Sequence, residues 1–208
     1  MRQYRIIFLL LSSLFLSSCA YHKLNSYKKK SDYKVPEEKL QSFNNVKRAL
    51  KYKTSIDVLN KHFTGIVVFK KTDAETWHLI FVTELGMSMF DFIVKGDSMK
   101  PAYVFDALNK PQTVNALVRD FETIFFVKWY NKNLEIREKS NKVAVYLKDG
   151  DHERFMLEDQ EHKTYQEQWV FYKHKKESKT TYSPGYERIK LKQYGLVKLY
   201  IEMEVINE

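Results

Sequence analysis

From residue 52 onward, apolar and polar residues alternate mainly with a period of two, which is the pattern of half-buried β-strands. The alternation is clearest near the C-terminus, where every second residue of 197–205 is apolar. Turn residues at Thr72-Asp73, Gly96-Asp97 and Asp149-Gly150 divide the pattern into hairpins, and Asp149-Gly150 favours a type I′ turn with positive φ at both central residues. We therefore expect about ten to eleven short antiparallel strands.

One segment has a helical period instead. Its apolar residues fall at i, i+3, i+4, i+7, i+10 and i+11 and form one stripe: Val114, Leu117, Val118, Phe121, Ile124 and Phe125. Asn109 and Pro111 are suited to the helix start, and Arg119 and Asp120 lie off the stripe, so we expect them on the surface. A second helix is expected over 37–50, after Pro36.

These elements predict a mainly β (α+β) fold. A long antiparallel sheet with one apolar face must bury that face, and it can do so by curling around a helix. The helix over 111–126 is the natural filler of the concave side, with one or two helices capping the sheet in all. Residues 36–208 are expected to form this single domain.

The N-terminus has the pattern of a bacterial secretory signal. Arg2 and Arg5 precede a short apolar run, and Leu16-Ser17-Ser18 leads directly to Cys19, the chain's one cysteine. This arrangement resembles a lipobox, which implies removal of residues 1–18 and thioether lipidation of Cys19 with a lipid that carries acyl chains such as palmitate. The alternative is an uncleaved membrane helix, but the apolar run is shorter than the ~20 residues that crossing a bilayer requires.

Residues 19–35 are interpreted as the lipidated N-terminus and a flexible stem. The run Lys28-Lys29-Lys30 is either a solvated linker or an electrostatic contact with the membrane beside the acyl chains. The formal charge is +9, or +7 without Arg2 and Arg5, and it favours anionic lipid headgroups. Nucleic acid is not expected for an exported chain. Ala20 favours the outer membrane, because Asp at that position would signal inner-membrane retention.

Candidate chemistry is sparse. No two of the six histidines have the spacing of a zinc hydrolase, and no Gly-x-Ser-x-Gly elbow is present, so we expect neither an enzyme nor a cofactor or metal. The acidic hairpin tip formed by Asp149, Asp151, His152 and Glu153 is interpreted as a solvated turn. Asp91, inside an apolar strand, either orients a ligand headgroup or points outward toward a lysine.

The lipobox, the meander of strands, the turn Thr83-Glu84-Leu85-Gly86 and the helix carrying Arg119-Asp120-Phe121 together resemble the lipoprotein-localisation (LolA/LolB) family. The resemblance implies a half-barrel whose apolar cavity holds acyl chains. The residues that would line it are Trp77, Leu79, Phe81, Leu117, Phe121, Leu199 and Ile201. Leu85, just before Gly86, would match an exposed residue of the family that helps insert cargo into the membrane.

The function expected from these features is that of a lipid-anchored outer-membrane lipoprotein that faces the periplasm. It would bind lipid or the acyl chains of other lipoproteins, with a role in lipoprotein localisation. The alternative is a structural or adaptor lipoprotein of the envelope that binds no ligand and has a filled core. An apolar pocket of ~300–1,000 Å³ would favour the first of these functions.

Overall fold

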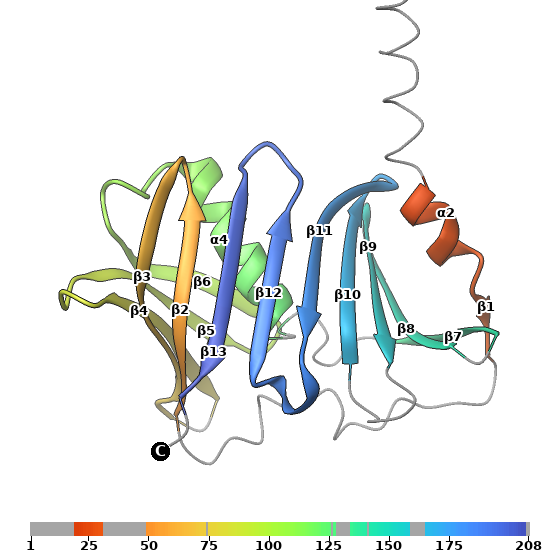
Figure 1. Cartoon of the computed structure of the whole chain (residues 1–208), viewed down its shortest axis with the longest axis horizontal. Helices are drawn as coiled ribbons and strands as arrows, with labels where there is room; N and C mark the ends of the chain where they lie inside the picture. The colour runs from red at the N-terminus through yellow and green to blue at the C-terminus, as the bar shows by residue number, and fades with distance from the viewer. Residues whose placement is uncertain are drawn as a thin grey trace, which may run out of the picture.

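The computed structural model describes residues 19–30, 49–73, 75–125, 127, 134–140, 142–158 and 165–206. They form one antiparallel sheet of 13 strands, in the order β1-β7-β8-β9-β10-β11-β12-β13-β2-β3-β4-β5-β6. The strands are β1 (Lys28–Lys29), β2 (Leu50–Val58), β3 (Lys61–Lys71), β4 (Thr76–Thr83), β5 (Ser88–Lys95), β6 (Ser98–Val104), β7 (Glu135–Lys139), β8 (Lys142–Asp149), β9 (His152–Glu158), β10 (Tyr165–Tyr172), β11 (Lys175–Tyr182), β12 (Arg188–Gln193) and β13 (Leu199–Val205). The sheet is open and curled, which confirms the expected half-barrel (Figure 1).

The hairpin turns follow the expected positions with one shift. Asp149 still belongs to β8 and pairs with His152, so the turn consists of Gly150 and Asp151, and only Gly150 has positive φ. The type I′ turn expected at Asp149-Gly150 is therefore wrong by one residue and in type. Positive φ at both central residues occurs instead at Leu59-Asn60, between β2 and β3, and at Lys173-His174, between β10 and β11.

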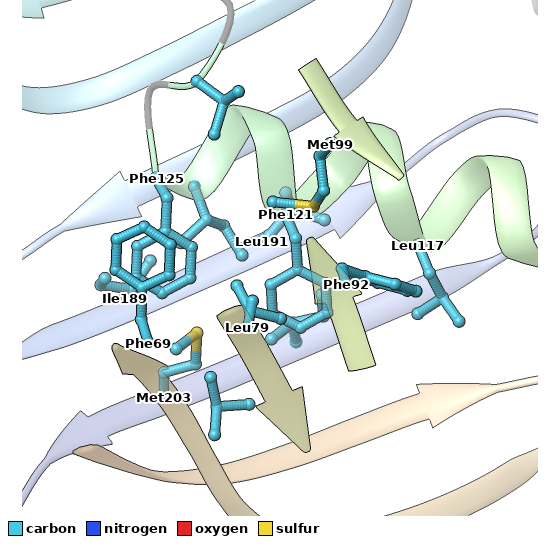
Figure 2. Packing of buried hydrophobic residues seen from close by; sticks show 14 of the residues in the cluster. Phe69, Leu79, Phe92, Met99, Leu117, Phe121, Phe125, Ile189, Leu191 and Met203 are labelled. Carbon is cyan, nitrogen blue, oxygen red and sulfur yellow. The ribbon is translucent and has the colours of Figure 1, made fainter. Parts of the chain in front are cut away.

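Helix α4 (Pro111–Ile124) lies across the concave face of the sheet, behind β12 and β13 in Figure 1. Its stripe packs inward as expected, with Leu117, Phe121 and Ile124 inaccessible to solvent and Val118 partly buried. Aromatic rings dominate this core: Phe125 stacks on Phe69 at 4.5 Å between ring centroids, and Phe121 lies 5.3 Å from Phe90. Figure 2 shows α4 side chains packed among residues of β3 to β5 and β12 to β13. The helix thus fills the concavity that the curled sheet creates.

A second helix, α2 (Cys19–Asn25), packs on the opposite face of the sheet. Leu24 and Tyr27 are buried there against Tyr146, Phe155 and Phe171 of β8, β9 and β10. These strands are apolar on both faces and therefore need cover on both sides, which explains why residues 19–30 form a packed helix and a strand rather than an extended stem. Strand β1 completes the contact by pairing with β7.

The 3₁₀ turn η2 (Pro184–Tyr186) connects β11 and β12. The helix expected over 37–50 lies almost entirely outside the described residues, and Leu50 itself begins β2. Among the helices that the structure describes, none has both the length and the apolar character needed to cross a bilayer.

Candidate functional site

The seven residues expected to line an acyl-chain cavity are brought together on the concave face. They are Trp77, Leu79, Phe81, Leu117, Phe121, Leu199 and Ile201, all members of one buried cluster. Trp77 is the most exposed of them, at 8%. Side chains of α4 pack against these strand residues and fill the concavity (Figure 2). The concave face is therefore apolar and is covered by α4.

Part of the polar side of α4 faces strand β11, whereas Gln112 and Asn115 of the same helix are exposed. Arg119 forms an ion pair with Glu177 of β11, at 2.6 Å between Nη1 and Oε1, and His152 lies 3.4 Å from the other oxygen of the same carboxylate. Arg154 of β9 is buried beside this group, and its Nη1 lies 3.9 Å from Asp149 Oδ2. The expectation that Asp120 is a surface group is wrong, because it is fully buried, whereas the Arg119 side chain pairs with the sheet and stays 29% exposed.

Asp120 is the least compensated group in this region. Its side chain is 0% exposed, and neither carboxylate oxygen has a hydrogen-bond partner. Loss of hydration raises the pKa of Asp120 to about 7, a shift that Arg119 opposes and Glu177 reinforces. Burial also lowers the pKa of His152, although Glu177 favours its charged form. The docked position of α4 therefore carries an electrostatic penalty.

Leu85 lies in the turn between β4 and β5 and is 88% exposed. The turn is tight: the Gly86 amide donates to the Thr83 carbonyl at 2.9 Å, and Gly86 has φ +81°. Met87, two residues later, is 49% exposed. A leucine held in such a turn has no core within reach, so its side chain is available to a membrane or a partner.

The acidic hairpin tip is solvated at Asp149 and Asp151, as the sequence indicated, but Glu153 is not. Glu153 is only 4% exposed, and its carboxylate accepts hydrogen bonds from the hydroxyls of Tyr21 and Tyr146, at 3.0 and 3.2 Å. His174 Nδ1 lies 3.0 Å from Glu153 Oε1. The carboxylate thereby links the first turn of α2 to the sheet. Sequence periodicity could not reveal this, because Tyr21 and Glu153 are 132 residues apart.

Two smaller points concern candidate chemistry. Asp91 lies on the outer side of β5 and pairs with His78 of β4, at 2.9 Å between Oδ1 and Nδ1, and not with a lysine. No group of three or more His, Cys, Asp or Glu side chains that could hold a metal ion occurs among the described residues. Cys19 is the first residue of α2, at the start of the described chain.

A curled antiparallel half-barrel with a helix across its concave face is the LolA-type fold. A LolA superfamily protein from Nitrosomonas europaea has a solved structure that aligns with a TM-score of 0.51 and 6% identity, over 84% of this chain and 93% of that one. A second structure, titled as an outer membrane lipoprotein-sorting protein domain from Vibrio parahaemolyticus, aligns at a TM-score of 0.41 and 6% identity, over 82% of this chain and 91% of that one. No family model matches the chain, and no curated protein matches it. At such low identity the likeness establishes the fold alone.

Proposed function

We propose that this chain is a lipid-anchored lipoprotein of the bacterial envelope whose concave face binds acyl chains of lipids or of other lipoproteins. In this proposal Cys19 carries the anchor, residues 1–18 are removed, and the domain faces the periplasm from the outer membrane. The observation that carries the proposal is that one helix, α4, covers a continuous apolar face while burying the uncompensated carboxylate of Asp120.

The energetics of exchanging α4 for an acyl chain support this function. Withdrawing the stripe of α4 exposes leucine and phenylalanine side chains, each worth roughly 1.5–3 kcal/mol of burial. An entering acyl chain restores about 0.8 kcal/mol for each CH₂ group that it buries. Displacement of α4 would also return Asp120 to water and relieve its desolvation penalty. Apolar contacts are thus traded for similar contacts, and the relief of Asp120 offsets part of the cost of breaking the Arg119–Glu177 ion pair.

Photocrosslinking tests the proposal on the full chain. A palmitate analogue with a diazirine near its methyl end would be incubated with the protein, irradiated, and located by peptide mass spectrometry. We expect crosslinks to the buried positions of β4 and β13, such as Leu79, Phe81 and Ile201, and we expect excess unlabelled palmitate to remove them. Crosslinks confined to exposed residues such as Leu85 and Leu196 would contradict acyl-chain binding in the concavity.

The filled concave face favours a second candidate function, that of an adaptor lipoprotein without a ligand. In that case α4 is a permanent part of the core, and the outer surface binds a protein of the envelope. The same crosslinking experiment separates the two functions, because a permanent core leaves Leu79 and Ile201 unlabelled. A specific protein recovered with the chain after crosslinking in cells would then identify the partner.

A further inference from the structure

Five connections between strands lie at one end of the sheet, and the described chain begins at that same end. Figure 1 shows α2 starting beside the β10–β11 connection, at the same end of the sheet as the β12–β13 and β2–β3 connections. The strand register agrees with this view, because Leu199 pairs with Val58 next to the β2–β3 turn, and the Tyr194 amide donates to the Glu177 carbonyl of β11 at 2.7 Å. The Lys173 amide donates to the Asp151 carbonyl, which places the β8–β9 and β10–β11 turns together as well.

A hollow of about 810 Å³ opens between the β12–β13 loop and the β2–β3 turn at this end. Its charged lining is mainly basic, with Lys61, Lys192 and Lys198. Within the described residues, none of these three lysines has an acidic partner. The one acid of the lining, Asp57, is held by His62 at 2.6 Å. The hollow therefore offers uncompensated positive charge to an anion.

An aromatic side chain fixes part of this basic wall. The ring of Tyr194 lies between two ammonium groups, with Lys176 Nζ at 3.6 Å and Lys192 Nζ at 5.5 Å from the ring centroid. Cation–π contacts of this kind orient lysine side chains without neutralising them. The positive charge of Lys192 thus stays available beside the hollow.

Apolar side chains flank the same hollow and point away from the core. Leu196, in the β12–β13 loop, is fully exposed at 104%, and Leu59 at the tip of the β2–β3 turn is 39% exposed. Leu59 also has φ +53°, a left-handed conformation that bulky side chains adopt at an energetic cost and that Gly or Asn would adopt more easily. An exposed leucine on a strained backbone motivates the hypothesis of a contact outside the molecule.

We propose that this end of the sheet docks on a bilayer that contains anionic phospholipid. The lysine-lined hollow binds a lipid phosphate, and Leu59 and Leu196 enter the region just below the headgroups. This inference rests on the membrane location in the proposed function, but it concerns a different surface from the concave face. Basic groups beside exposed leucines fit an anionic bilayer better than a soluble anion, which would have no use for the leucines.

The test measures where the β12–β13 loop lies, because the N-terminal segment alone could hold the chain on vesicles. The full chain with Cys19→Ser and Leu196→Cys would carry one environment-sensitive fluorophore at residue 196. It would be added to vesicles of phosphatidylcholine, or of equal parts phosphatidylcholine and phosphatidylglycerol, with nitroxide-labelled lipid as quencher. The control carries the fluorophore at Glu75→Cys, an exposed residue of the β3–β4 connection at the opposite end of the sheet.

We expect strong quenching at residue 196 in the anionic vesicles, little in pure phosphatidylcholine, and little at residue 75 in either. Replacing Lys61, Lys192 and Lys198 by Gln should abolish most of the quenching. The matched triple variant replaces Lys53, Lys70 and Lys100, which are exposed elsewhere on the sheet. It removes the same amount of charge and should retain the quenching. High salt should weaken the response, because the attraction to the headgroups is screened.

Several results would overturn the docking proposal. These are equal quenching at residues 196 and 75, equal quenching in both kinds of vesicle, and equal loss in the two triple-lysine variants. A response of the fluorophore to inorganic phosphate but not to anionic vesicles would make the hollow a site for a free anion instead. The palmitate crosslinking detects binding at the concave face, whereas the fluorophore detects insertion of the β12–β13 loop. Failure of acyl-chain binding and failure of bilayer docking can therefore be told apart.

Discussion

The hydroxyl of Tyr21 donates a hydrogen bond to the carboxylate of Glu153, with 3.0 Å between Tyr21 Oη and Glu153 Oε2. Burial and the neighbouring carboxylate raise the pKa of Tyr21 to about 12, so the phenol stays a donor at all physiological pH values. Tyr21 lies two residues after Cys19. A lipid at Cys19 would therefore be attached to a segment that the sheet holds in place, which would limit how the domain tilts on the membrane.

Removing this hydrogen bond should loosen α2. We expect Tyr21→Phe to lower the free energy of unfolding by about 1 kcal/mol, since a hydrogen bond to a charged group contributes this much or more. The matched control is Tyr103→Phe, whose exposed hydroxyl should be dispensable. Denaturant unfolding measures the stability, and hydrogen exchange of the amides of residues 21–27 measures the loosening. Equal exchange in both variants would show that Glu153 does not hold the helix.

Asp120 should make the protein less stable as the pH rises. The native pKa is about 7 and the ordinary value is 3.8, so between these values the folded state binds a proton that the unfolded state has lost. Stability from this group is full below about pH 4, falls by up to ~1.4 kcal/mol per pH unit as the pH rises, and levels off above about pH 7. Denaturant unfolding across this range measures the slope.

The variant Asp120→Asn keeps the shape of the side chain and removes its charge. It should flatten the pH dependence and be more stable than the unmodified chain at neutral pH. Asp106→Asn, at an exposed position before α4, is the matched control and should leave the slope unchanged. If Asp120→Asn retained the full slope, the pH dependence would come from another group; His152 is not that group, because its lowered pKa makes stability rise with pH.

Phe121 should be the most sensitive position of α4. Its ring is fully buried between Phe90 and Phe92 of β5 and Phe125 of the same chain segment. Truncation to Ala leaves a cavity that close-packed rings cannot fill, at a cost of about 3–5 kcal/mol. Asn115→Ala, on the exposed side of the helix, should change stability little. Thermal unfolding of the two variants gives the comparison, and similar melting temperatures would mean that α4 is not docked in solution.

The strand pattern was predictable because burial on one face imposes a period of two. In β13, Leu199, Ile201 and Met203 are buried, whereas Tyr200 and Glu202 are partly exposed, as the alternation indicates. The stripe of α4 was predictable for the same reason with a helical period. These are local patterns in which each residue's surroundings follow from its neighbours in the chain.

The polar side of α4 was not predictable, because its surroundings come from distant strands. Arg119 looks like a surface residue in the sequence, yet its partner Glu177 lies on β11, 58 residues later. Whether the concavity is filled also depends on how side-chain volumes combine across the sheet, which periodicity does not encode.

Cys19→Ser tests the proposed anchor. Loss of the thiol removes the atom to which a lipid would be attached, so cells fed an alkyne-tagged palmitate should label the unmodified chain and not the variant. The variant should also leave the membrane fraction or remain unprocessed. Ser18→Ala, a small residue next to the cysteine, is the control and should keep the label. Equal labelling of the Cys19→Ser variant would contradict the lipobox interpretation.

Leu85→Glu tests the exposed turn between β4 and β5. The side chain is 88% exposed, so a charge there should change the melting temperature little. The Glu84 amide donates to the Thr64 carbonyl, which places the turn at the same end of the sheet as Leu59. In a domain anchored at this end, Leu85 would enter the lipid and gain roughly 1.5–3 kcal/mol, which a glutamate would forfeit.

We therefore expect Leu85→Glu to weaken insertion into vesicles, or transfer of bound acyl chains, at least tenfold while folding stays intact. Ile93→Glu, on the outer side of β5 and near the opposite end of that strand, is the control for adding a charge to an exposed apolar position. Unchanged insertion by a stably folded Leu85→Glu protein would remove Leu85 from the membrane contact, whereas a lowered melting temperature would mean that the leucine folds back onto the sheet.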